Sequence, residues 1–123
     1  MRKTAKFATT AVSLAALFAG ASMMPTVAGA ADAEQIKYGK EVAFDRKKGN
    51  CLSCHMMDDG VSPGDLGPPL IAMQARFPDR AKLRAQIWDA QIANPGTRMP
   101  PFGKHQALSE KEIDAIVDYL YTL

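Results

Sequence analysis

The stretch Cys51-Leu52-Ser53-Cys54-His55 reads C-x-x-C-H and contains both cysteines of the chain and one of its two histidines. Two thiols three residues apart project from the same side of one helical turn, so each can add to one vinyl group of the same porphyrin. The imidazole that follows can then bind the iron from beneath as the proximal ligand. We therefore predict one haem c, attached through thioethers to Cys51 and Cys54 and ligated by His55.

Redox dithiols and zinc sites also contain C-x-x-C pairs. A thioredoxin-like dithiol requires a strand–helix–strand setting, and no strand pattern surrounds this pair. A zinc site requires two further cysteine or histidine ligands, and the chain offers only His105. A disulfide across so short a loop would add little stability, because the closure entropy is small. These alternatives are weaker than the haem interpretation.

Residues 1–30 have the pattern of a secretory signal peptide. Residues 1–6 are basic, residues 7–20 are mostly apolar, and Ala28-Gly29-Ala30 is a small-x-small cleavage pattern. We expect cleavage near Ala30, which leaves residues 31–123 as one periplasmic mono-haem domain. An uncleaved membrane anchor is the alternative, but the apolar stretch is short for a span of about 20 residues. It also contains no cysteine for lipidation.

Removing the leader changes the charge balance. Arg2, Lys3 and Lys6 leave with it, so the 15 basic residues fall to 12 against 13 acidic ones, a net charge of −1. The basic precursor therefore gives no indication of a nucleic-acid partner. A domain of this size buries only about 60–65% of its unfolded surface, so an apolar haem would give its core a centre.

Helix signals predict an all-α fold. Asp32 and Gln35 resemble a capping box that opens a helix over 32–47. Ile36, Gly39 and Ala43, with Tyr38 and Val42 as further candidates, would face inward. Gly39 costs a helix about 1 kcal/mol relative to alanine, which close approach of another helix would offset. The alternative is an incidental glycine near a fraying end. Basic residues 46–48 would stabilise the helix, because a helix carries partial negative charge at its C-terminus.

Further helices are expected after the motif. We predict a short one over 70–75 and a longer one over 78–93, with Leu83, Ile87 and Ala90 on its stripe and Trp88 and Ile92 beside it. Trp88 is either a core aromatic or a partner of a haem propionate. Ser109 and Glu112 form a capping box for the last helix. Its stripe is Ile113, Ile116, Val117 and Leu120, flanked by Tyr119 and Tyr121.

Gly67-Pro68-Pro69-Leu70 follows the motif after a loop over 56–67. Pro69 restrains Pro68 to extended geometry and leaves a rigid carbonyl there. A ligating histidine usually donates its second ring N–H to such an acceptor. We therefore expect Pro68 to bind His55 and Leu70 to pack on the haem. The alternative is that G-P-P-L is only a turn.

The second axial position has several candidate ligands. Met56 and Met57 lie too close to His55 to reach the opposite face, and Met73 suits core filling. Met99 lies in the proline-bounded loop Asn94-Pro95-Gly96-Thr97-Arg98-Met99-Pro100-Pro101-Phe102. A thioether is a soft, neutral ligand that favours Fe(II) and raises the potential. We predict Met99 as the sixth ligand, with His105 or an open site as the alternatives.

Together these features resemble class I cytochromes c over the whole mature length. The shared features are a helix before C-x-x-C-H, a G-P-x-L turn, a methionine loop and a terminal helix with I-V-D-Y-L. The resemblance implies the class I cytochrome c fold, in which Gly39 and Tyr119 lie where the N- and C-terminal helices cross. One departure is the longer connection over 45–50.

A narrower resemblance is to the SoxX family, a subunit of the SoxAX cytochromes of sulfur-oxidising bacteria. It rests on G-P-P-L, A-R-F-P-D-R, L-R-A-Q-I-W-D-A and N-P-G-T-R-M-P-P-F-G-K-H, in that order. It implies a periplasmic heterodimer with SoxA, an L-cysteine S-thiosulfotransferase that joins thiosulfate to a cysteine of the carrier SoxYZ. Within it, this chain would pass electrons to a small cytochrome, with His55 and Met99 as the axial pair. No residue here matches a catalytic nucleophile.

Two other functions remain open. One is a stand-alone periplasmic electron shuttle, and the other is a haem peroxidase or ligand sensor with an open sixth site, for which His105 is the only distal histidine. A set of basic side chains could steer an acidic partner or form only a solvated rim. The set comprises Arg46, Lys47, Lys48, Arg98 and Lys104.

Overall fold

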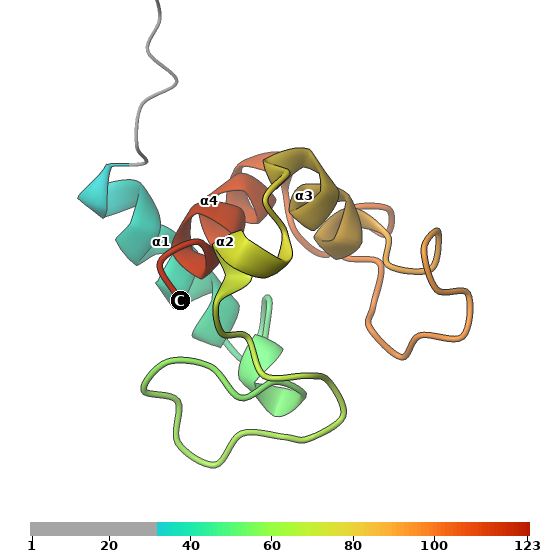
Figure 1. Cartoon of the computed structure of the whole chain (residues 1–123), viewed down its shortest axis with the longest axis horizontal. Coiled ribbons are helices and arrows are strands. Elements are labelled where there is room, and N and C mark those ends of the chain that lie inside the picture. Colours follow the sequence, from blue (N-terminus) through green and yellow to red (C-terminus); the bar gives the residue numbers. More distant parts are fainter. Residues whose placement is uncertain (1–31) are drawn as a thin grey trace, which may run out of the picture.

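A computed structural model describes residues 32–123, so the predicted signal peptide over 1–30 lies outside the described residues. The described part is helical and contains no strand, as the sequence predicts (Figure 1). Its elements, in chain order, are α1 (Ala33–Phe44), the 3₁₀ turn η1 (Cys51–Ser53), α2 (Met73–Arg76), α3 (Arg80–Trp88) and α4 (Glu110–Leu120). Within residues 32–123, none of these helices has the length and hydropathy needed to cross a membrane.

Helix α1 begins where the sequence predicts and ends earlier. The Asp32 carboxylate accepts a hydrogen bond from Gln35 N at 2.6 Å. The helix stops at Phe44 rather than Lys47, because Asp45 is extended and its side chain accepts from Lys47 N at 2.8 Å. The expectation that residues 46–48 stabilise the helix C-terminus is therefore wrong, since they lie in the turn that follows.

Helices α1 and α4 cross at Gly39, and Figure 1 shows them against each other in cyan and red. A Cβ atom on Gly39 would overlap the Ala115 carbonyl oxygen and lie 3.0 Å from Tyr119 Cβ. The close approach predicted at this glycine is confirmed. Tyr119 is only 2% exposed and so belongs to the core instead of flanking it.

Helix α4 supplies a large share of the core. Its capping box is present in both directions, with Ser109 N donating to the Glu112 carboxylate at 2.8 Å. All four residues of the predicted stripe are buried: Ile113, Ile116, Val117 and Leu120. Met73, predicted as core filler, is 2% exposed.

Helix α3 is shorter than predicted. It begins after the N-cap Asp79 and ends at Trp88, five residues before the expected end at Ala93. The Trp88 carbonyl accepts hydrogen bonds from Gly103 N and Lys104 N, so the next turn of helix does not form. Ile92, expected beside the buried stripe, is 80% exposed. Leu83, Ile87 and Ala90 are buried as predicted.

Helix α2 starts three residues later than expected. Leu70 N donates to Met56 O at 2.8 Å, which keeps residue 70 in the loop. Met73 N donates to Leu123 O at 3.0 Å and ties the helix start to the C-terminus. The predicted helix over 70–75 is therefore corrected to Met73–Arg76.

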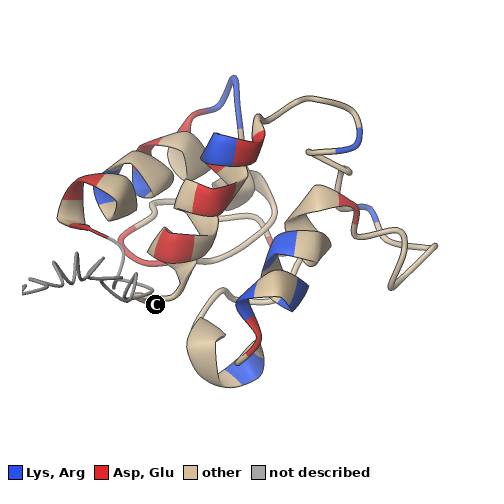
Figure 2. Cartoon of the chain, turned by 90° about the horizontal axis from the view of Figure 1, so that it is seen from above, with Lys and Arg blue, Asp and Glu red and all other residues tan. Residues whose placement is uncertain are grey.

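Helices α3 and α4 are joined by ion pairs. Arg80 pairs with Asp118 at 2.8 Å, and Arg84 pairs with Asp114 at 2.8 Å and Glu110 at 3.0 Å. Figure 2 shows basic residues on α3 and mainly acidic ones on α4. Partly exposed pairs of this kind each contribute little to stability.

Candidate haem-binding site

The C-x-x-C-H motif forms one tight helical turn, which the turn over 45–50 separates from the end of α1 at Phe44. Asn50 enters it with φ 45°, a left-handed conformation that asparagine tolerates. Cys54 N and His55 N both donate to Cys51 O, at 3.1 and 2.9 Å. Gly49 N donates to Val42 O at 3.2 Å and so fixes the turn to α1. The motif is thus presented by a rigid backbone.

The loop after the motif folds back alongside it. Three backbone N–H groups donate to carbonyls of the motif region at 2.8–2.9 Å. The pairs are Gly64 N to Leu52 O, Gly67 N to Cys54 O, and Leu70 N to Met56 O. This pairing brings the G-P-P-L segment against the histidine.

His55 is held at one ring nitrogen. Its Nδ1 lies 2.7 Å from the Pro68 carbonyl oxygen, which is the hydrogen bond that the G-P-P-L pattern predicts. A Cβ atom on Gly67 would overlap the imidazole, so the ring lies directly on the backbone there. With Nδ1 as the donor to Pro68, Nε2 is the nitrogen left for an iron.

The two cysteines are free thiols and are not joined by a disulfide. Burial raises the pKa of the Cys51 thiol to about 11. A reactive dithiol needs a lowered pKa at its nucleophilic sulfur, so this environment is unlike that of a redox C-x-x-C pair. A buried sulfur of this kind suits a thioether bond better than a free nucleophile.

Apolar side chains from several segments remain only half-buried around the core. They include Cys51, Leu52, Leu70, Phe77, Trp88, Met99 and Phe102. Two thiols, an oriented imidazole, a thioether and this apolar surface together fit a covalently bound haem. His55, Cys51 and Cys54 are brought together with Pro68, whereas Met99 comes from the separate loop between α3 and α4.

The other candidate axial ligands are placed differently. Met57 is 1% exposed within the core, and Met56 is 49% exposed. His105 is exposed in a turn where its N–H donates to Pro101 O at 3.0 Å. Met99 is half-buried, and its N–H donates to Thr97 Oγ1 at 3.2 Å. The assignment of Met99 as ligand stays a prediction.

Two of the basic side chains expected to steer a partner are paired with carboxylates of the same chain. Lys48 pairs with Glu112, and Lys104 pairs with Asp89 at 2.9 Å. Arg46 and Arg98 are exposed. The steering role of this set stays a prediction.

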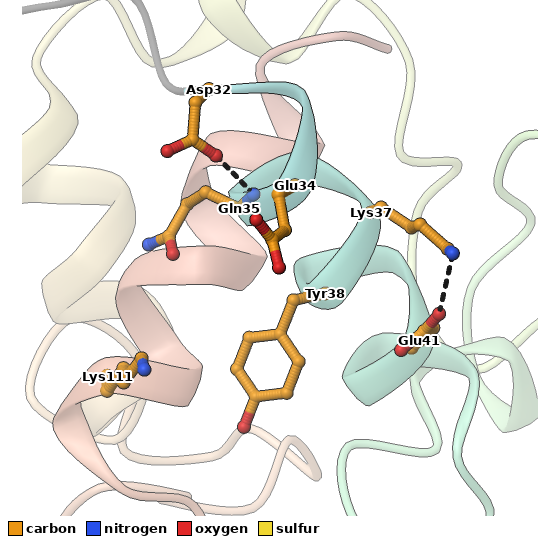
Figure 3. A pocket seen from close by; sticks show the side chains of 7 residues that line it. All are labelled: Asp32, Glu34, Gln35, Lys37, Tyr38, Glu41 and Lys111. Atoms are coloured by element: carbon orange, nitrogen blue, oxygen red, sulfur yellow. Dashed lines mark hydrogen bonds and ion pairs between the residues drawn. The ribbon is translucent and has the colours of Figure 1, made fainter.

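Two surface hollows lie on α1. One, of about 510 Å³, is lined by polar and charged side chains of α1 and by Lys111 of α4 (Figure 3). Its lining contains none of the predicted site residues. The other, of about 610 Å³, includes Phe44, Leu52 and Val61 and so borders the C-x-x-C-H turn. Neither shows a convergent set of catalytic groups.

Comparison with known protein families matches residues 36–120 to the family described as cytochrome c oxidase, cbb3-type, subunit III. The matched segment contains the C-x-x-C-H turn, the G-P-P-L segment and the Met99 loop. The chain belongs to this family. It is therefore a c-type cytochrome with the class I fold and a covalently bound haem, suited to electron transfer and located outside the cytoplasm.

One relative is an uncharacterized lipoprotein of Aquifex aeolicus (strain VF5). It is 34% identical over 85 residues, which are 68% of this chain and 40% of the relative. The cytochrome therefore spans about 40% of the length of that relative.

The sequence pattern indicates no separate role for Gly67. The structure makes it a contact surface for the His55 ring, because no side chain there would leave room for the imidazole. A glycine directly before the rigid Pro68-Pro69 pair was the available signal, since such a position often marks close backbone approach.

Proposed function

We propose that this cytochrome carries single electrons through one haem, joined to Cys51 and Cys54 and ligated by His55 and Met99. A haem bound there supplies the one-electron couple of its iron. The observation that carries the proposal is the hydrogen bond from His55 Nδ1 to Pro68 O at 2.7 Å. It fixes the tautomer and orientation of the ring and raises the basicity of the ligating nitrogen.

The chain's own residues contribute orientation and exclusion of water. Gly67 and Pro68 hold the imidazole on one side, and half-buried Leu70 and Phe102 supply apolar surface. If His55 and Met99 both bound the iron, no position would be left open for peroxide or gas, and the haem would change redox state with little rearrangement. This separates an electron carrier from a peroxidase or ligand sensor.

We further propose that the chain acts in the periplasm as the SoxX-like subunit of a thiosulfate-oxidising complex, after cleavage near Ala30. The support is the run of four motifs from G-P-P-L to N-P-G-T-R-M-P-P-F-G-K-H. A SoxA-like subunit would carry the transferase chemistry on a SoxYZ-like carrier, and a small cytochrome would accept the electrons. The lipoprotein name of the relative makes a membrane-held form the competing arrangement.

The test is purification of the tagged full-length chain from the periplasm of its native host. A second haem-bearing chain that stays bound through size exclusion, and haem reduction on adding thiosulfate with the carrier protein, would support the proposal. A lone monomer that thiosulfate does not reduce would favour the stand-alone shuttle. Recovery only from the membrane fraction would contradict the soluble periplasmic form.

A further inference from the structure

The segment between α3 and α4 leaves the body of the protein and returns to the same point. Gly103 N and Lys104 N both donate to the Trp88 carbonyl, at 3.1 and 3.2 Å. Residues 89–102 are thereby closed at their base into an Ω-type loop, which projects from the helices in orange in Figure 1. Met99 lies within this loop.

An ion pair lies at the same point. Lys104 Nζ is 2.9 Å from Asp89 Oδ2, and the Asp89 side chain is only 4% exposed. The other carboxylate oxygen, Oδ1, accepts from Gln91 N at 3.1 Å. A buried carboxylate without a nearby cation is destabilising, because its charge is left uncompensated. The charge of Asp89 is therefore stabilised by Lys104.

The returning backbone also contacts the Trp88 ring at the base of the loop. A Cβ atom on Gly103 would overlap the Trp88 indole, so the returning backbone lies directly on the ring. The Arg84 guanidinium covers the same indole, 5.4 Å from its centroid. Trp88, Asp89, Gly103 and Lys104 together form what we call the loop neck.

Inside the loop, the hydrogen bonds are local. Asn94 accepts from Gly96 N and Thr97 N, at 3.2 and 3.0 Å, and Thr97 Oγ1 accepts from Met99 N at 3.2 Å. Phe102 N donates to Pro100 O at 3.0 Å. Among the described residues, the long-range hydrogen bonds that tie this segment to the helices are those of the loop neck. Met99 and Phe102 also pack against the core, so the loop neck and this packing together set the place of Met99.

We propose that Asp89 and Lys104 are positioning residues that hold the Met99 loop closed and so keep its thioether bound against competing ligands. This inference rests on the proposed ligation by His55 and Met99. It assigns a role to two charged residues that touch neither ligand, and it predicts that the neck sets how readily Met99 is displaced.

The test is titration of the ferric holoprotein with imidazole, which must displace Met99 to bind. Lys104→Met is expected to raise the apparent imidazole affinity about tenfold, because the Met99 thioether competes less well for the iron once the loop neck is weakened. Lys104→Arg restores a cation and should return the affinity to within about twofold of wild type. Asp89→Asn removes the ion pair without leaving a buried charge uncompensated, so it should raise the imidazole affinity by less than Lys104→Met. It serves as the second variant if Lys104→Met fails to retain haem.

The matched control is Lys48→Met, which removes a different lysine–carboxylate pair, with Glu112, outside the Met99 loop. It should leave imidazole affinity unchanged while affecting global stability. An equal rise in Lys48→Met, or no rise in both neck variants, would overturn the inference. Failure of the ligation itself has a separate signature: Met99→Ala would then leave both the sulfur–iron charge-transfer band and the imidazole affinity as in wild type.

Discussion

Gly39 lies directly on the carbonyl group of Ala115, so α1 and α4 touch backbone to backbone at their crossing. Gly39→Ala would force the helices apart. Overpacking of this kind costs about 1–3 kcal/mol. The better helix propensity of alanine returns about 1 kcal/mol of that at most. We expect a net fall in the free energy of unfolding, measured by denaturant titration of circular dichroism.

The control for this substitution is Gly96→Ala. A Cβ atom on Gly96 would meet only Asn94 Oδ1, at 3.6 Å, an ordinary contact. Its φ is not positive, so alanine fits the backbone. Equal stability of the two variants would show that the helix crossing is not limited by the glycine.

A second prediction concerns Gly67, on which the His55 ring rests. Gly67→Ala should displace the imidazole and lengthen its hydrogen bond to Pro68 O. We expect covalent haem to be retained, because Cys51 and Cys54 are untouched, but the midpoint potential and the low-spin ferric spectrum to change. A spectrum and a potential identical to those of the wild-type protein would show that this contact does not position the ligand.

A third prediction concerns the contact between α4 and the loop after the haem motif. Tyr119 OH donates to Asp58 Oδ2 at 3.0 Å, and Lys40 pairs with the same carboxylate at 2.8 Å. Tyr119→Phe keeps the ring and removes this hydrogen bond, at a cost of about 0.5–1.5 kcal/mol. Amide exchange over residues 56–60 should quicken.

The matched variant is Tyr121→Phe, which removes the hydrogen bond from Tyr121 OH to Phe77 O at 2.7 Å. This bond lies near α2 rather than at the haem loop. Exchange over residues 56–60 should stay as in wild type. Faster exchange there in both variants would mean that the loop responds to global stability instead of to Asp58.

A fourth prediction concerns acid stability. Lys48 and the capping contacts with Ser109 lower the pKa of Glu112 from 4.5 to about 2. The unfolded state then binds the proton more readily, so the stabilisation is complete above about pH 5 and is lost as pH falls towards 2. Because Lys48 is exposed to solvent, we expect Glu112 to contribute on the order of 1 kcal/mol.

Urea titrations between pH 6 and pH 2 measure this effect. Glu112→Gln should flatten the fall in unfolding free energy over that interval. Glu110→Gln is the control, because Glu110 lies in the same turn with its side chain 74% exposed. A slope in Glu112→Gln equal to that of wild type would contradict the assigned role of the carboxylate.

The sequence predicts those features that depend on residues close together in the chain. The capping box of Ser109 and Glu112 and the buried stripe of α4 depend on spacing within one helix, and they are as predicted. The hydrogen bond between His55 and Pro68 was predictable because Pro69 restrains the carbonyl. The close approach at Gly39 was foreseen because a helical glycine needs compensation.

The remaining features depend on partners far along the chain. Helix α3 ends at Trp88 because Gly103 and Lys104 take its carbonyl, which no periodicity over 78–93 reveals. The burial of Tyr119 depends on how closely α1 approaches. The pairing of Asp89 with Lys104 spans a loop without regular structure, so sequence spacing gave no signal for it.

The central claim is that a haem is bonded covalently to Cys51 and Cys54. The direct measurement is to denature the mature protein, extract it with acidified organic solvent, and record the haem absorbance of both phases, with a Cys51→Ser/Cys54→Ser variant as the control. We predict that the absorbance stays with the wild-type polypeptide and leaves the variant. Haem that passes into the solvent from the wild-type protein would contradict the account.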